Sequence, residues 1–290
     1  MTEAKTVERL LHLGERVLTD STHIFEGHDL EWETEELMAL ALDIDVEDLA
    51  MDLQPTKRQR EHYLSLIARR AAGEPLPFLT GRIEFYGLDL QVIPGAFVPR
   101  PSSELTVARA LRKLRLRPSP KIVDVCTGAG PIALALAAEL TGSEVWGADI
   151  SIEGLRQARR NARALKIANA SFIVSDMYDS FPSKLRGSVD LIAGHVPYVP
   201  IDEIDDLPAE VIDHEPLSTL SDETDDGLVV MRRAIEEAPA WLKPGGWLLL
   251  EVSDDLTTVL RRMCRKAGLE DKGAHTDEDR LSMVVEARSR

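Results

Sequence analysis

From residue 121 onward, short apolar runs alternate with longer amphipathic stretches, and this alternation constrains the fold more than any other feature. Short apolar runs predict buried strands, and the periodic stretches between them predict helices. Strands are expected at residues 121–126, 144–149, 170–175, 189–193, 247–252 and 281–287, and helices at 131–140, 152–164, 227–242 and 256–267. Such a chain builds a mostly parallel sheet with helices on both faces. This α/β fold binds ligands at the carboxyl ends of its strands.

The first eighty residues have a different pattern. Their apolar side chains recur at helical spacing, with no strand alternation, which predicts a small helical bundle. Residues 85–93 alternate well enough for one or two short strands, and Pro94-Gly95 follows them as a turn signal. The basic stretch 112–120 ends in Pro-Ser-Pro and is expected to be a connection.

Composition and charge exclude several classes of protein. The 290 residues carry 34 Lys and Arg against 50 Asp and Glu, a formal charge of −16, which disfavours a nucleic-acid partner. No apolar run is long enough to span a membrane, and the two cysteines, Cys126 and Cys264, indicate a reducing cytoplasm rather than a disulfide framework. The histidines show no metal-ligand spacing, so no metal site is expected.

An acidic segment lies between residues 201 and 226, which contain eleven Asp and Glu and no Lys or Arg. Such runs are commonly solvated loops. The segment follows a predicted strand end, however, so it is also a candidate site for a cationic ligand.

The sequence DVCTGAG (124–130) follows one predicted strand and opens a helix. Gly128 and Gly130 allow the backbone to approach a ligand at the helix N-terminus. Asp149 ends the next strand, where it can accept two ribose hydroxyls, and Asp176 follows the third, where it can accept an adenine amino group. Acids at three successive strand ends suit a nucleoside cofactor without phosphates, which favours S-adenosylmethionine over a dinucleotide.

The segment DVCTGAG with PIALAL (131–136) resembles the first motif of class I S-adenosylmethionine methyltransferases. Further segments resemble, in order, the HemK/PrmC family of protein-glutamine N5-methyltransferases: GEPLPFLTG (73–81), EFYGL (84–88), VPRPSSEL (98–105), HEP (214–216), DGL (226–228) and DR (279–280). The resemblance covers nearly the whole chain. Ser103 stands where the family usually has Thr, which keeps a hydroxyl.

The resemblance implies a Rossmann-like, seven-stranded class I methyltransferase domain over residues 99–290, preceded by a helical substrate-binding domain (1–80) and a β-hairpin linker (81–98). It implies S-adenosyl-L-methionine as cofactor and S-adenosyl-L-homocysteine as product. The expected cofactor contacts are Asp124, Thr127, Gly128, Ala129, Gly130, Asp149, Ile150, Asp176, Met177 and His195. The expected substrate contacts are Arg100, Pro101, Val196, Tyr198, Asp202 and Glu215, and the expected catalytic residues are His195, Pro197 and Tyr198.

The chain departs from the family at this catalytic motif. The family has Asn-Pro-Pro-Tyr, whereas this chain has His-Val-Pro-Tyr at residues 195–198. A carboxamide nitrogen is a poor nucleophile, and in the family the Asn oxygen and a backbone carbonyl hold its N–H groups in line for transfer. The carbonyl of Val196 can still serve, and a neutral His195 offers one acceptor nitrogen and can also take a proton. His195 is therefore a general base, a hydrogen-bond acceptor or a tolerated replacement.

Four functions compete. The preferred one is N-methylation of a small basic guanidino or amine compound, such as the δ-nitrogen of free arginine, with His195 as base and the acidic segment as cation site. The alternative is N5-methylation of a glutamine in peptide chain release factors. An adenine-N6 nucleic-acid methyltransferase is disfavoured by the charge, and a degenerate, non-catalytic fold by the intact Gly128, Gly130 and Asp149. No membrane partner is expected, and nothing indicates the oligomeric state.

Overall fold

The computed structural model describes residues 6–24, 27–276 and 283–290. The chain divides into two compact units: unit 1 is Met1–Arg82 with Asp205–His214, and unit 2 is Ile83–Ile204 with Glu215–Arg290. The DR segment at 279–280 and the first residues of the strand expected at 281–287 lie outside the described residues. In the described part of the chain, no helix has the length and hydropathy that crossing a membrane requires.

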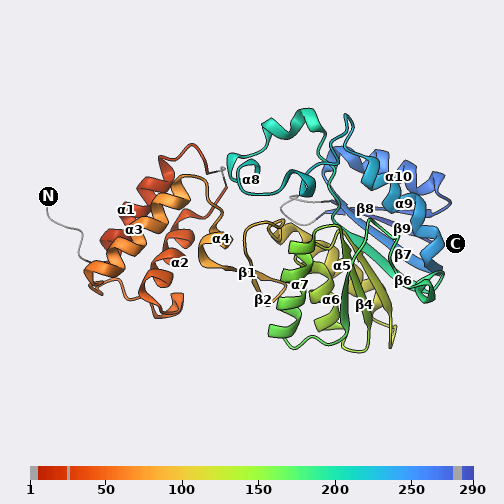
Figure 1. The fold of residues 1–290 in the computed structure, drawn as a ribbon, viewed down its shortest axis with the longest axis horizontal. Helices are drawn as coiled ribbons and strands as arrows, with labels where there is room; N and C mark the ends of the chain where they lie inside the picture. Colours follow the sequence, from red (N-terminus) through yellow and green to blue (C-terminus); the bar gives the residue numbers. More distant parts are fainter. Residues whose placement is uncertain (1–5, 25–26, 277–282) are drawn as a thin grey trace. The chain divides into compact units, whose positions relative to one another are not determined.

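Unit 1 is helical (Figure 1). Its helices are α1 (Val7–Thr19), α2 (Leu30–Leu42), α3 (Lys57–Ala71), α4 (Leu76–Thr80) and the short α8 (Ala209–Ile212). Helix α3 begins at a capping box in which Thr56 and Gln59 satisfy each other's backbone N–H groups. Tyr63 of α3 is buried and donates its hydroxyl to the Leu10 carbonyl at 3.2 Å. Gly14 makes room for that hydroxyl, because a Cβ there would stand 2.1 Å from it.

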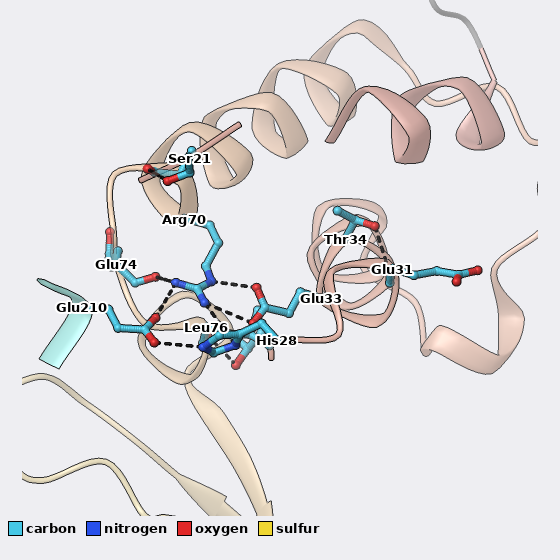
Figure 2. Close-up of polar contacts among 11 residues, drawn as sticks. Ser21, His28, Glu31, Glu33, Thr34, Arg70, Glu74, Leu76 and Glu210 are labelled. Carbon is cyan, nitrogen blue, oxygen red and sulfur yellow. Dashed lines mark hydrogen bonds and ion pairs between the residues drawn. The ribbon is translucent and has the colours of Figure 1, made fainter. Parts of the chain in front are cut away.

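A group of four charged residues, which we call the Arg70 quartet, joins α8 to the other helices of unit 1 (Figure 2), and of its members Arg70 and Glu33 are buried. Arg70 is fully buried and donates to both oxygens of Glu33 at 2.7 and 3.1 Å and to Glu210 Oε2 at 2.8 Å. His28 lies between the same carboxylates, 2.7 Å from Glu33 and 2.9 Å from Glu210. Hydrogen bonds to Glu210 and then Glu33 raise the pKa of His28 to about 9. The protonated quartet therefore balances two cations with two anions.

Unit 2 is built on a seven-stranded sheet in the order β5-β4-β3-β6-β7-β9-β8 (Figure 1). The strands are β3 (Lys121–Val125), β4 (Glu144–Asp149), β5 (Ala170–Val174), β6 (Val189–Gly194), β7 (Leu242–Val252), β8 (Glu270–Thr276) and β9 (Met283–Arg288). Strands β3 to β7 pair in parallel, and β9 pairs antiparallel with β7 and β8. The strand order reverses between β3 and β6, which makes that point the expected binding crevice.

Helices cover both faces of this sheet. They are α5 (Glu104–Leu114), α6 (Pro131–Glu139) and α7 (Ile152–Ala164) on one face, and α9 (Val229–Trp241) and α10 (Thr257–Lys266) on the other. Alternate residues of each strand serve the two cores: Ile122 and Leu191 pack with α5 to α7, and Val123 and Ile192 with α9 and α10. Burial on both faces explains why the central strands β3 and β6 are nearly continuous apolar runs in the sequence.

The sequence prediction of a Rossmann-like, seven-stranded α/β fold is confirmed. Several local predictions differ from the structure. Strand β7 begins at Leu242, five residues before the strand expected at 247–252 and within the helix expected at 227–242. Residues 112–114, expected in a connection, form the last turn of α5. Strand β8 was not predicted, because its sequence EDKGAHT has no apolar alternation and the strand lies at the sheet edge.

A hairpin of β1 (Arg82–Phe85) and β2 (Leu88–Gln91) precedes the sheet in the chain. Its two turn residues, Tyr86 and Gly87, have φ of +49° and +72°. Two successive positive φ values are typical of the type I′ turn, whose twist matches that of the strands. The amide of Tyr86 also donates to Glu104 Oε1 at 2.7 Å, which ties the turn to α5.

Candidate active site

A cavity of about 370 Å³ opens in unit 2, where β3, β4, β5 and β6 end. Most of the residues predicted from the sequence line it: Arg100, Asp124, Thr127, Gly128, Ala129, Asp149, Ile150, Asp176, Met177, His195 and Pro197. The topology therefore brings together side chains from four strand ends and from the loop before α5.

The glycine-rich turn after β3 is held by Asp149. The amide of Gly128 donates to Asp149 Oδ2 at 2.8 Å, and that of Ser151 donates to Oδ1 at 2.7 Å. Burial raises the pKa of Asp149, and these amide hydrogen bonds oppose the rise. Among the described residues, no heavy atom lies within 4 Å of the position a Gly128 Cβ would take, so a ligand can approach this backbone closely. Cys126 adopts φ of +54°, a strained conformation for a non-glycine residue and a common mark of functional sites.

Asp124 lines the cavity with a buried carboxylate, one oxygen of which has no hydrogen-bond partner in the described chain. It is 1 % exposed, and its Oδ2 accepts from the Thr127 hydroxyl at 2.5 Å. Its Oδ1 is buried without a hydrogen-bond partner in the described chain. Burial raises the pKa of Asp124 to about 7. An unsatisfied buried carboxylate oxygen is costly, and an ammonium group in the cavity would satisfy it.

The outer part of the cavity is more exposed. Asp176, predicted to meet the adenine, is 63 % exposed and forms an ion pair with Arg233 Nη1 at 2.7 Å. Arg233 comes from α9 and also lines the cavity. Ile150 is 59 % exposed and offers an apolar surface at the end of β4. Any hydrogen bond from an adenine to Asp176 would therefore have to share this carboxylate with Arg233.

His195 stands at the end of β6, in the wall of the cavity. Its ring lies edge-on to Phe97, with centroids 5.4 Å apart, and is stacked on Tyr198 at 5.8 Å. Its Nδ1 is 3.2 Å from Ser103 Oγ and 3.5 Å from Glu251 Oε2. Burial lowers the pKa of His195 below its ordinary value, against the opposing charge of Glu251. The imidazole is therefore neutral at neutral pH.

Some predicted site residues lie outside the cavity lining. Gly130 is needed for helix packing, because a Cβ there would stand 3.0 Å from Ala158 Cβ of α7. Val196 is buried in the core beneath α9 and α10, so only its backbone remains a candidate for substrate contact. The Tyr198 ring stacks on that of His195. Burial raises the pKa of the Tyr198 phenol to about 12. Pro101 and Asp202 are exposed, at the starts of two short 3₁₀ segments.

Glu215, predicted to contact substrate, instead holds the Pro-Arg-Pro loop. It is buried, and its Oε1 accepts from Arg100 Nη2 at 2.5 Å. Its Oε2 accepts from the Val98 amide at 3.4 Å. Arg100 also lies over the Phe97 ring, 4.3 Å from its centroid, which places the guanidinium beside His195. Glu215 therefore positions a cavity residue.

Four of the eleven acids in the segment 201–226 accept hydrogen bonds or form ion pairs within the described protein. Asp222 accepts from the amides of Val229 and Val230 at the start of α9, and Asp226 pairs with Arg232. Glu215 and Glu210 have the partners described above. Asp222 and Glu223 are the acids of this segment that line the cavity in the described chain. The remaining seven acids are exposed, which agrees with a solvated loop, and the acids of the segment are not concentrated at the cavity.

Two residues near His195 were missed by the sequence prediction. Glu251 is the second-last residue of β7, and its only signal was a charge within the apolar run WLLLEV (247–252). Gly227 was noted only as part of a family segment. A Cβ on Gly227 would stand 2.5 Å from the Tyr198 carbonyl oxygen, so this glycine lets the chain pass directly against the catalytic motif. Its φ of +60° also favours glycine.

The fold and the cavity define a class I S-adenosylmethionine-dependent N-methyltransferase. The residues present fit this cofactor. Asp124 Oδ1 has no hydrogen-bond partner in the described chain and would accept from the cofactor ammonium group, and the open space at Gly128 would admit the cofactor close to the backbone. Asp149 retains lone pairs that would accept from the ribose hydroxyl groups. When bound, S-adenosylmethionine supplies an electrophilic methyl group on a sulfonium sulfur. In the described part of the chain, no group of three or more His, Cys, Asp or Glu could hold a metal ion.

Comparisons with known proteins identify the branch of that class. Residues 116–286 match a methyltransferase domain family, and residues 10–81 match the PrmC N-terminal domain family. The release factor glutamine methyltransferase of Streptomyces coelicolor is 39% identical over 72% of this chain and 77% of its own length. That of Bradyrhizobium diazoefficiens is 35% identical over 87% of this chain and 86% of its own. The chain therefore belongs to the release factor glutamine methyltransferase (HemK/PrmC) family.

A solved structure agrees at the level of the fold. The 16S rRNA methyltransferase RsmC of T. thermophilus, in complex with AdoMet and guanosine, superposes with a TM-score of 0.51 at 20% identity. It covers 72% of this chain, and this chain spans half of it. The match supports the class I fold.

Proposed function

We propose that this enzyme transfers a methyl group to the N5 side-chain nitrogen of a glutamine in a peptide chain release factor. The observation that carries the proposal is a neutral, acceptor-capable imidazole at the strand end where the family holds the substrate amide. The relatives named above act on release factors by name, and residues 10–81 of this chain match the PrmC N-terminal domain family. Two unpaired thiols, Cys126 and Cys264, agree with a reaction in the reducing cytoplasm.

Methylation of a glutamine side chain requires the site to hold a neutral amide. A carboxamide nitrogen carries two N–H groups, and two acceptors that fix them hold the nitrogen in line with the incoming methyl group. His195 supplies one acceptor in its neutral form, and the Val196 carbonyl is the candidate for the second. As the methyl group arrives, the nitrogen becomes acidic, and the N–H held by His195 is the proton it must lose.

The preferred sequence hypothesis of a small basic acceptor loses its main support. It relied on the acidic segment as a cation site, but four of its acids are already bound to Arg70, Arg100, Arg232 and the start of α9, and of its eleven acids only Asp222 and Glu223 line the cavity in the described chain. Two guanidinium groups, Arg100 and Arg233, also line the cavity. None of the relatives named above is a free-arginine methyltransferase by name. The alternative, the release factor, is the function these findings favour.

The test uses the full-length enzyme, methyl-labelled S-adenosylmethionine and purified release factor, with free arginine assayed in parallel. Mass spectrometry of the digested factor should place one methyl group on a glutamine side chain. His195→Ala should lower kcat by about 100-fold, because the amide loses a positioning contact. The matched variant His195→Asn restores a fixed acceptor oxygen and should keep kcat within about tenfold of the parent. Methylation of free arginine without methylation of the release factor would refute the proposal.

A further inference from the structure

The register of the sheet places Glu251 beside His195. Strands β6 and β7 run parallel with Gly194 opposite Leu250, so the residues that follow them, His195 and Glu251, are neighbours at the same sheet edge. Glu251 is 1 % exposed. A buried carboxylate is costly unless it is hydrogen-bonded, so its contacts show what it does.

Hydroxyl groups and one imidazole surround this carboxylate. Ser102 donates to Oε1 at 3.0 Å, and Thr106 lies 3.5 Å from Oε2. The same Oε2 is 3.5 Å from His195 Nδ1, and Ser103 Oγ is 3.2 Å from that nitrogen. The polar neighbours of the imidazole thus gather on its Nδ1 side, whereas the ring lines the cavity.

This arrangement matters because an imidazole differs from the amide that the family has at this position. The acceptor atom of an Asn is fixed as its oxygen. In a neutral imidazole, the acceptor is whichever nitrogen lacks the proton. An ionised carboxylate only accepts hydrogen bonds. A lone pair on Nδ1 would face that negative charge, and a proton on Nδ1 would be attracted by it.

We propose that Glu251 is a positioning residue that keeps the proton of His195 on Nδ1, so that Nε2 presents its lone pair to the substrate N–H. The inference rests on the proposed function for the identity of that N–H, but the tautomer itself does not depend on it. Ser103 completes the arrangement, because its hydroxyl can accept the Nδ1 proton. Replacement of the family's Asn by His is thereby accommodated by a buried carboxylate on the next strand.

The charged and titratable groups around His195 define the expected pH behaviour. Glu251 faces it from β7, Arg100 from the loop before α5, and Tyr198 from its own loop, and Glu215 neutralises Arg100. Protonation of His195 removes the acceptor, so activity falls on the acid side. Because the Glu251 charge favours the protonated ring, Glu251→Gln should move this acid limb to lower pH.

The first test is activity-independent. Nitrogen-15 NMR of the histidine-labelled enzyme should show His195 protonated at Nδ1 and unprotonated at Nε2. In Glu251→Gln, the proton should redistribute toward Nε2, and in Glu251→Asp, which keeps the carboxylate, it should stay on Nδ1. A buried carboxylate elsewhere in the sheet, Glu286 of β9, provides the control, and Glu286→Gln should leave the His195 signals unchanged. S-adenosylmethionine binding measured by calorimetry confirms that each variant is folded.

The second test is a double-mutant cycle on release factor methylation. Glu251→Gln should lower kcat by about 10- to 100-fold, the usual cost of losing the partner that orients an imidazole, with the KM for S-adenosylmethionine unchanged. In a His195→Asn background, the same change should have little effect, because no tautomer remains to be fixed. Equal losses in both backgrounds, or unchanged His195 NMR signals in Glu251→Gln, would overturn the proposal. A parent enzyme that ignores release factors would refute the proposed function alone, because the NMR result stands without the acceptor.

Discussion

Replacing Glu210 with alanine should destabilise the helical unit by about 3 kcal/mol at neutral pH. The change removes two charge-assisted hydrogen bonds, to Arg70 at 2.8 Å and to His28 at 2.9 Å. Hydrogen bonds to charged groups contribute roughly 1.5–3 kcal/mol each. We take about 1.5 kcal/mol for each of these two hydrogen bonds, because the side chains of Glu210 and His28 are 12% and 31% exposed. Arg70 keeps its two contacts with Glu33, so the loss stays below that of an isolated buried charge.

The same contacts predict a dependence on pH. The pKa of His28 rises from 6.5 to about 9 through its hydrogen bonds to Glu210 and Glu33. At about 1.36 kcal/mol per pH unit, this would contribute ~3.4 kcal/mol, which solvent screening reduces to about 1.5–2 kcal/mol for a partly exposed ring. Because the folded-state pKa is raised, this contribution is complete below pH 6.5 and is lost as pH rises through about 9. Glu210→Ala should flatten that dependence.

Native-state hydrogen exchange with mass spectrometry can localise the effect. Peptides from α1, α2 and α3 should exchange faster in Glu210→Ala, whereas peptides from β6 and β7 should not change. Urea unfolding at about pH 7 and about pH 10 measures the pH term. The control is Asp206→Ala, an exposed acid of the same segment, expected to change stability by less than about 0.5 kcal/mol. Equal, small effects of both variants would refute the view that the quartet stabilises this unit.

Three further predictions concern the cavity. Asp149→Ala should weaken S-adenosylmethionine binding by about 10- to 150-fold in calorimetry, since carboxylate hydrogen bonds contribute ~1.5–3 kcal/mol, and unchanged affinity would remove Asp149 from the site. Cofactor affinity should rise with pH through about 7, as Asp124 ionises and attracts the cofactor ammonium, and Asp124→Asn should abolish this rise. Gly227→Ala should lower kcat at least about tenfold by displacing the catalytic loop. Gly187→Ala, with a similar φ of +64° but open space around its Cβ among the described residues, should not, and equal effects would contradict the steric explanation.

The parts of unit 2 that the sequence predicted well are those with a strong local signal. Strand β4 and helix α7 begin and end where the apolar pattern placed them, because burial of strands on both faces and a clear amphipathic helix leave little ambiguity. The glycine-rich turn and Asp149 were predicted for a similar reason, since a strand end, two glycines and an acid lie within one short segment. The Gly128 amide that binds Asp149 is a local consequence of that pattern.

Long-range pairings could not be read from the sequence. Glu210 and Arg70 are 140 residues apart, and nothing in an acidic run indicates which of its members is paired. Glu215 was predicted to contact substrate, but its partner Arg100 is 115 residues away in the sequence. Glu251 was missed because a single acid at the end of an apolar strand has no distinctive spacing. In each case the decisive information is the register of the sheet or the packing of the helices.

The discontinuous make-up of the helical unit has a consequence for synthesis. Arg70, His28 and Glu33 leave the ribosome long before Glu210, so the nascent bundle lacks the carboxylate that pairs with Arg70 and contributes most to the raised pKa of His28. Only when residues 205–214 emerge, after β3 to β6 have been made, does the fourth charge complete the group. The helical unit, although encoded first, therefore matures late, and its final stability waits for part of the catalytic unit to be translated. A fragment excised at Arg82 would lack the Glu210 carboxylate permanently.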